Sequence, residues 1–167
     1  MNVLRILTCA VAAATITQVA VVRANAQENT NVWTCSNFSA IAPEPLGDRE
    51  NHALTLSQWG CRVVSGPLAG GVAIGDNTWE WDGPTGKELT FRLVVRKPGA
   101  TAVLRGTSGS QMVTLTAGKA TGMTGTGRYD YVLATGSWAP LAGKSETWTI
   151  KSGGPGPLDF SVESTLE

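Results

Sequence analysis

Residues 122–138 restrict the possible fold more than any other segment of the chain. The segment is rich in glycine and threonine, contains two tyrosines and ends on a tryptophan. Threonine and tyrosine favour the pleated surface of a β-sheet, and glycine permits bulges and tight corners. A helix is disfavoured here because each internal glycine costs about 1 kcal/mol relative to alanine. The segment therefore predicts a curved β-sheet.

The first 26 residues have the pattern of an export signal. Arg5 gives the start a positive charge, residues 6–22 are almost entirely apolar, and the Ala24-Asn25-Ala26 sequence fits a small-x-small cleavage site. The alternative is an uncleaved membrane anchor. It is disfavoured because the apolar run is at the short limit for a membrane span and is rich in alanine. We expect residues 1–26 to be removed and residues 27–167 to form one domain, secreted or periplasmic.

The charge of the expected mature chain argues against a nucleic-acid partner. Without the leader, 11 basic and 13 acidic residues remain, a formal net charge of −2. The largest basic cluster is the pair Arg96-Lys97, whereas nucleic-acid-binding domains carry extended basic patches. No apolar segment after residue 26 is long enough for a membrane-spanning helix. Neither a nucleic acid nor a membrane span is therefore expected for the mature chain.

Two cysteines, Cys35 and Cys61, remain after the leader. An even pair in an exported protein predicts a disulfide, and the alternative is two unrelated buried thiols. The chain has one histidine, His52, no Cys-x-x-Cys sequence and no acidic cluster with the spacing of a calcium loop. No metal ion or other cofactor is expected.

Short alternating segments separated by glycine and proline indicate an all-β chain. The clearest hairpin joins residues 72–82 to residues 87–97, and a second is expected across a turn at residues 108–110. The expected strands are residues 32–38, 53–64, 72–82, 87–97, 101–107, 111–117, 121–131, 133–138, 144–151 and 158–163. This many short strands predicts an antiparallel β-barrel or β-sandwich.

Three motifs in the C-terminal half resemble the allene oxide cyclase/dirigent barrel family. They are Gly-Thr-Gly-Arg-Tyr at residues 125–129, Ala-Thr-Gly-Ser-Trp at residues 134–138 and Glu-Thr-Trp-Thr-Ile at residues 146–150. The resemblance covers residues 102–160. The chain departs from the family pattern in the longer connector at residues 130–133 and in Pro140, and its N-terminal half carries no such motif.

The resemblance implies an eight-stranded antiparallel barrel with a small apolar lumen, often assembled as a homo-oligomer. Plant members of that family cyclise an epoxide or steer radical coupling, using a few polar groups set in the lumen. No catalytic residue is carried over, because the acidic and basic positions of those enzymes do not align with this chain.

Aromatic side chains of the best hairpin are the candidate ligand-binding residues. By alternation, Trp79 and Trp81 share a wall with Leu89, Phe91 and Leu93. These side chains either line a pocket for an apolar or aromatic ligand or fill the core, since eight-stranded barrels are just wide enough for side chains to fill.

Two sets of polar residues are the candidate catalytic groups. Glu80 and Arg92 are expected on the face opposite the aromatic wall, where they either polarise a substrate or form a solvated salt bridge. Tyr129 and Tyr131 share one face and provide hydrogen-bond donors at a barrel mouth or cap the core. His52 lacks the Gly-x-Ser-x-Gly sequence that would place it in a hydrolase triad.

The sequence therefore predicts an exported β-barrel that binds a small apolar ligand or a partner surface. One alternative is a cofactor-free isomerase or cyclase, and another is a structural envelope protein. A lumen lined by aromatic side chains and a buried charged or phenolic group favours the enzyme. A lumen filled by side chains would leave only an interaction surface.

Overall fold

The computed structural model describes residues 29–38, 43–117, 119–152 and 159–167. The expected leader, residues 1–26, lies outside the described residues. The strands are β1 (Thr30–Asn37), β2 (Glu44–Pro45), β3 (His52–Ser65), β4 (Val72–Asp82), β5 (Thr85–Lys97), β6 (Ala100–Thr116), β7 (Lys119–Ala134), β8 (Ser145–Ser152) and β9 (Asp159–Leu166). A short 3₁₀ helix, η1 (Gly136–Leu141), lies between β7 and β8.

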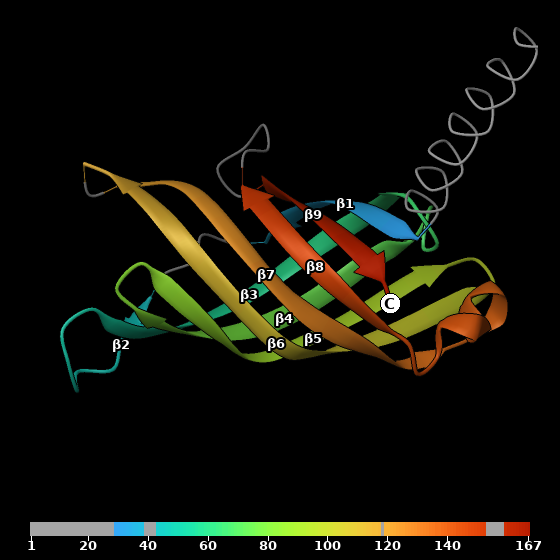
Figure 1. The fold of residues 1–167 in the computed structure, drawn as a ribbon, viewed down its shortest axis with the longest axis horizontal. Helices are drawn as coiled ribbons and strands as arrows, with labels where there is room; N and C mark the ends of the chain where they lie inside the picture. The colour runs from blue at the N-terminus through green and yellow to red at the C-terminus, as the bar shows by residue number, and fades with distance from the viewer. Residues whose placement is uncertain (1–28, 39–42, 118, 153–158) are drawn as a thin grey trace, which may run out of the picture.

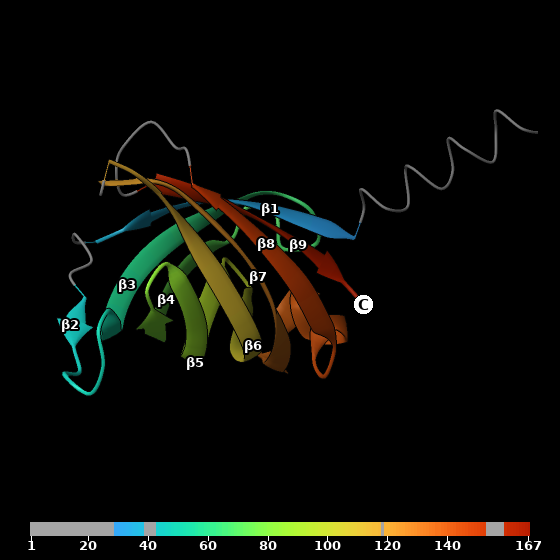
Figure 2. The same ribbon diagram turned by 60° about the vertical axis from the view of Figure 1, so that its left-hand side comes forward.

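Eight of these strands form a closed antiparallel barrel (Figure 1). The order is β1-β9-β8-β7-β6-β5-β4-β3, and β1 also pairs with β3, which completes the ring. The two-residue strand β2 is added outside the ring, beside β3. Figure 2 shows the long strands β3 to β7 curving strongly around the interior. The predicted all-β, eight-stranded antiparallel barrel is confirmed, and the sandwich alternative is wrong.

The predicted disulfide is confirmed at the closure of the barrel. Cys35 of β1 and Cys61 of β3 are direct register partners and are covalently bonded. The bridge therefore links the two strands that close the ring.

The end of the barrel beside η1 is packed with side chains. Leu68, Val95 and Tyr131 are almost completely buried there, and η1 adds the buried side chains of Trp138 and Leu141. Figure 1 shows η1 at the opposite end of the barrel from β2. The η1 end is therefore closed, and any opening lies at the β2 end.

Two expectations for the C-terminal half were wrong, because glycine serves a different purpose there. Residues 101–117 were expected to form a hairpin, but β6 is one strand that pairs with β7 through Gly109. Gly109 permits close packing instead of a turn, since a Cβ there would lie 2.7 Å from Glu88 Oε2. Residues 133–138 were expected to be a strand, but β7 ends at Ala134 and Gly136 takes a positive φ of 61° into η1.

The predicted hairpin of β4 and β5 is confirmed, with a bulge that changes the faces of β5. Thr78 pairs with Thr90, but Trp79 pairs with Glu88, so Leu89 is the extra residue. The prediction that Leu89 faces the interior is therefore wrong, and its side chain is 47% exposed. Glu88 turns inward in its place, whereas Phe91 and Leu93 are buried as expected.

Candidate functional site

The barrel contains a large cavity that extends toward the β2 end. Its volume is about 1240 Å³ and it is partly open to solvent. The wall comes from every strand of the ring, and the rim includes Pro45, Gly47, Pro84 and Leu115 from the loops and strand ends near β2. The interior is therefore not filled by side chains along its whole length.

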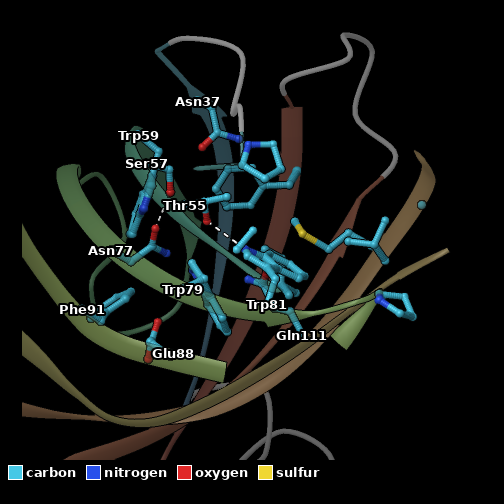
Figure 3. A pocket seen from close by; sticks show the side chains of 18 of the residues that line it. Asn37, Thr55, Ser57, Trp59, Asn77, Trp79, Trp81, Glu88, Phe91 and Gln111 are labelled. Carbon is cyan, nitrogen blue, oxygen red and sulfur yellow. Dashed lines mark hydrogen bonds between the residues drawn. The ribbon is translucent and has the colours of Figure 1, made fainter. Parts of the chain in front are cut away.

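Aromatic rings form much of the cavity wall (Figure 3). Trp79 and Trp81 lie with their ring centroids 6.1 Å apart on β4. The centroids of Trp59 and Phe91 are 5.6 Å apart, and Phe91 stacks on Tyr129 at 5.7 Å with nearly parallel planes. The predicted ligand-binding residues Trp79, Trp81 and Phe91 therefore all line one cavity.

The same wall carries a few neutral polar groups that sequence alternation alone did not single out. Ser57 donates a hydrogen bond to the amide oxygen of Asn77, and the Trp81 indole N–H donates to Thr55 Oγ1 at 2.9 Å. Gln111 is buried and also lines the cavity. Figure 3 shows these side chains on the same cavity as the aromatic rings.

Glu88 is an acidic group of the cavity lining, beside the aromatic rings. It pairs across the sheet with Trp79, and its Oε2 lies against the backbone of Gly106 and Gly109 on β6. A Cβ at Gly106 would come within 2.9 Å of Glu88 Oε2, so these glycines leave the space the carboxyl group occupies. Both carboxyl oxygens are buried and have no hydrogen-bond partner among the described residues. Burial raises the pKa of Glu88 from its usual 4.5 to about 8, so the group is mostly a neutral acid at pH 7.

Two indole groups of the lining are also unsatisfied. The Nε1 atoms of Trp59 and Trp148 are buried and have no hydrogen-bond partner among the described residues. These two indole groups and the Glu88 carboxyl group therefore lie beside the cavity without a hydrogen-bond partner among the described residues, which is rare for buried polar groups in folded proteins.

The predicted tyrosines meet a second acid instead of the cavity centre. Tyr129 donates to Glu146 Oε2 at 2.7 Å, Tyr131 donates to Oε1, and Asn31 Nδ2 donates to Oε1 at 2.9 Å. Glu146 and Tyr131 are fully buried and do not line the cavity, whereas Tyr129 does. Burial, and then the nearby Glu146 carboxylate, raise the pKa of both tyrosines above their usual value. Both hydroxyls are therefore held as donors to a buried carboxylate, an arrangement that links β1, β7 and β8.

The other two candidate catalytic residues lie outside the barrel and are not brought together. Arg92 is exposed and lies across from Asp76 and Arg105, whereas Glu80 lies four residues along β4 from Asp76. The Glu80 carboxylate contacts His52 instead of Arg92.

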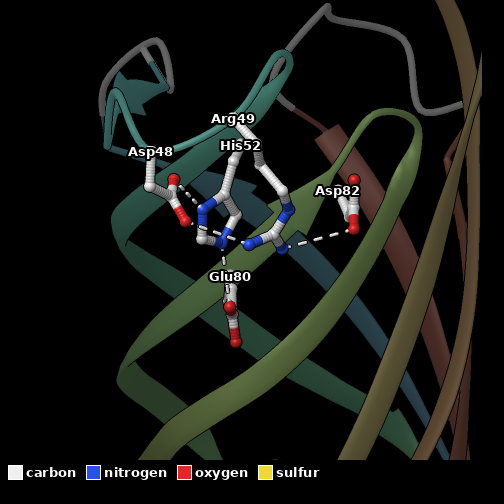
Figure 4. Close-up of polar contacts among 5 residues, drawn as sticks. All are labelled: Asp48, Arg49, His52, Glu80 and Asp82. Carbon is white, nitrogen blue, oxygen red and sulfur yellow. Dashed lines mark hydrogen bonds and ion pairs between the residues drawn. The ribbon is translucent and has the colours of Figure 1, made fainter.

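The mouth of the cavity carries a cluster of ion pairs (Figure 4). His52 Nδ1 lies 2.5 Å from Asp48 Oδ1, and its Nε2 lies 2.8 Å from Glu80 Oε1. Arg49 bridges Asp48 at 3.1 Å and Asp82 at 3.3 Å. Hydrogen bonds to Asp48 and then Glu80 raise the pKa of His52 above its usual value, and the bond to His52 lowers the pKa of Asp48. This cluster ties the loop after β2 to the ends of β3 and β4.

Glu88 was missed because alternation was counted along β5 alone. Counting outward from the turn at Gly83 and Pro84 pairs Trp81 with Gly86 and Trp79 with Glu88. That count places Glu88 on the aromatic wall, and it was available from the turn sequence. Glu146 gave no comparable signal, because its partners come from β1 and β7.

The disulfide fits a protein that folds outside the cytoplasm. Within the described part of the chain, no helix has the length and apolar character needed to cross a membrane. No protein-family model, curated protein or solved structure matches this chain.

Proposed function

We propose that this protein is a binding barrel that holds a small, largely apolar molecule in its lumen. The observation that supports it is the cavity of about 1240 Å³ lined by Trp59, Trp79, Trp81 and Phe91. Eight-stranded barrels are just wide enough either to be filled by side chains or to hold one small ligand. Ligand sites are typically apolar cavities of about 300–1,000 Å³ with a few convergent polar groups, and this lumen has that composition.

The proposed place of action is outside the cytoplasm, either secreted or periplasmic. The disulfide between Cys35 and Cys61 supports this, as does the export pattern of residues 1–26. An exported carrier or sensor of a small molecule is the role that fits both the compartment and the cavity.

A fluorescence titration tests binding in the lumen. N-phenyl-1-naphthylamine is a neutral probe whose emission rises on entering an apolar site, and we expect saturable binding to the folded, oxidised protein. Ala53→Phe introduces a ring into the cavity wall and should weaken binding at least tenfold. The matched control is Leu56→Phe on the same strand, because Leu56 is 78% exposed on the outer face.

Failure of the probe to bind the wild type would contradict the proposal. Equal affinities in the wild type and in Ala53→Phe would place any binding outside the lumen and would also contradict it. Circular dichroism of both variants confirms that the barrel is folded in each comparison.

A second candidate is a cofactor-free isomerase, and Glu88 is the observation that favours it. A largely neutral carboxylic acid in an apolar cavity can give a proton to one atom of a substrate and accept one from another. Tyr129 and Tyr131 are less suited to this role because both hydroxyls donate to Glu146. The resemblance to the allene oxide cyclase/dirigent family is consistent with such chemistry.

A simple proton-transfer reaction tests this candidate. Cyclohex-3-enone loses an α proton and gains a γ proton to become the conjugated enone, which is followed by its ultraviolet absorbance. The wild type should accelerate the conversion, Glu88→Gln should not, and Glu163→Gln on the outer face of β9 should match the wild type. Equal rates in wild type and Glu88→Gln would contradict this candidate.

A further inference from the structure

The charges around the lumen favour a positive ligand. Its basic lining residues are Arg49 and His52, and both belong to the mouth cluster. That cluster contains three acids, Asp48, Glu80 and Asp82, against two bases, so its net charge is −1 when His52 is protonated. The deeper acid, Glu88, has no basic partner among the described residues.

The aromatic wall adds to the same preference. The faces of indole and phenyl rings carry negative potential, which attracts organic cations placed over them. Trp79 and Trp81 lie side by side on β4, and the Trp59 and Phe91 pair faces the same cavity. An aromatic lumen with an unpaired carboxyl group is the arrangement that suits a cation carried on an apolar body.

Glu88 is positioned to balance such a cation. It is the direct cross-strand partner of Trp79, so a charge held against that ring lies close to the carboxyl group. Gly106 and Gly109 provide the space on β6 that the side chain occupies, and no donor among the described residues competes for its oxygens. We propose that the lumen selects monovalent organic ammonium ligands, with the cation against the Trp79 and Trp59 rings and Glu88 as its counter-charge.

This inference rests on the proposed function, because it names the class of ligand for the same cavity. It also predicts proton release. In the empty lumen Glu88 holds a proton at neutral pH, and a bound cation favours the carboxylate. The proton then leaves to solvent as the ammonium–carboxylate pair forms, and no covalent bond changes.

The groups around Glu88 allow this effect to be assigned. Trp79 of β4, Phe91 of β5 and the backbone of β6 face the carboxyl group. The charged residues of those strands that lie on the outer face or at the mouth are Asp76, Glu80 and Asp82 on β4, Lys87, Arg92 and Arg96 on β5, and Arg105 on β6. Lys97 of β5 lies at the closed η1 end instead, with its Nζ 4.7 Å from the centre of the Trp138 ring. His52 loses its positive charge at higher pH, and this loss would also strengthen the binding of a cation. Any pH dependence of cation binding that persists in Glu88→Gln is therefore assigned to the mouth cluster.

Two probes of the same shape provide the test. Phenyltrimethylammonium carries a permanent charge, and tert-butylbenzene is its neutral counterpart. We expect the cation to bind the full, oxidised protein at least tenfold more tightly at pH 9, measured by tryptophan fluorescence. Its affinity should fall by about tenfold per pH unit below pH 8, because each binding event releases one proton. Calorimetry in two buffers of different ionisation enthalpy measures that proton directly.

Two variants distinguish a counter-charge at Glu88 from the general effect of removing one acidic residue. Glu88→Gln should lose the preference for the cation and most of the pH dependence, while its affinity for tert-butylbenzene stays within about threefold of wild type. Glu163→Gln removes an exposed acid from the outer face and should leave every constant unchanged.

Three results would overturn the inference without affecting the proposed function. The first is equal binding of the two probes by the wild type, and the second is a cation preference that Glu88→Gln retains. The third is a neutral ketone such as acetophenone that binds more tightly below pH 8 and depends on Glu88, because the acid would then be a hydrogen-bond donor. Absence of N-phenyl-1-naphthylamine binding to the wild type would instead contradict the lumen as a ligand site.

Discussion

Glu88 should make the barrel less stable as the pH rises. Its pKa is about 8 in the folded protein and 4.5 in the unfolded chain, so folding holds a proton that the unfolded state releases. When folding raises the pKa of a group, the group adds its full amount to the free energy of unfolding at pH values below its unfolded pKa. That stabilisation is lost as the pH rises through the folded pKa. The relevant window is therefore pH 4.5 to 8.

The shift sets the size of the effect. Each pKa unit corresponds to about 1.36 kcal/mol, so the free energy of unfolding should fall by about 3 kcal/mol between pH 4.5 and pH 7 from this group alone. Above pH 8 the total loss in the free energy of unfolding reaches about 4–5 kcal/mol and no longer changes with pH. Glu88→Gln removes the titration but keeps the shape and an unpaired polar group, so the variant should lack this slope.

Urea denaturation at pH 5, 6, 7 and 8, followed by tryptophan fluorescence, measures the slope. The difference between wild type and Glu88→Gln isolates the group, because the other acids titrate equally in both proteins. Glu163→Gln should run parallel to the wild type across the whole range. Parallel profiles for wild type and Glu88→Gln would refute the assignment of a buried, neutral Glu88.

Three further results are expected. Replacing Cys35 and Cys61 by alanine should lower the free energy of unfolding by about 3–4 kcal/mol, the effect of a loop of this length, and reductant should then leave the melting temperature unchanged. Glu146→Ala leaves three buried donors unpaired and should destabilise by about 3–5 kcal/mol in denaturant titrations; a loss below about 1 kcal/mol would contradict its role in the core. The imidazole of His52 should titrate by NMR above its usual pKa, and Glu80→Gln should lower that value; an unchanged midpoint would contradict the contact.

The barrel was predictable from the sequence because its strands alternate regularly along most of their length. Trp33, Cys35, Trp59 and Cys61 fall on inward positions by simple counting, and the same count brings the two cysteines to one face. The disulfide followed from the compartment expected for the chain. These features depend on local periodicity, which a single sequence contains.

The site was less predictable because it depends on irregularities and on contacts between distant strands. One bulge at Leu89 changes which side chains face inward in the part of β5 before it, so that Leu89 is exposed and Glu88 lies inside. Gly109 was interpreted as a turn residue, although its function is to allow an acid from the neighbouring strand to pack against it. The partners of Tyr129 and Tyr131 on β8 depend on the register of the closed ring, which periodicity alone does not fix.

Closure through β1 also has a consequence for assembly. β1 pairs on one side with β3, an early neighbour in the chain, and on the other with β9, the last strand. The other seven strands of the ring can pair without β9, and the Cys35–Cys61 bond then holds β1 against β3. In that state β1 and β8 each have one edge with unpaired backbone groups. Such edges template pairing between chains, so a chain truncated before Asp159 should associate with its own copies. By pairing with both β1 and β8, the eight-residue strand β9 covers these two edges and should therefore protect the protein from self-association.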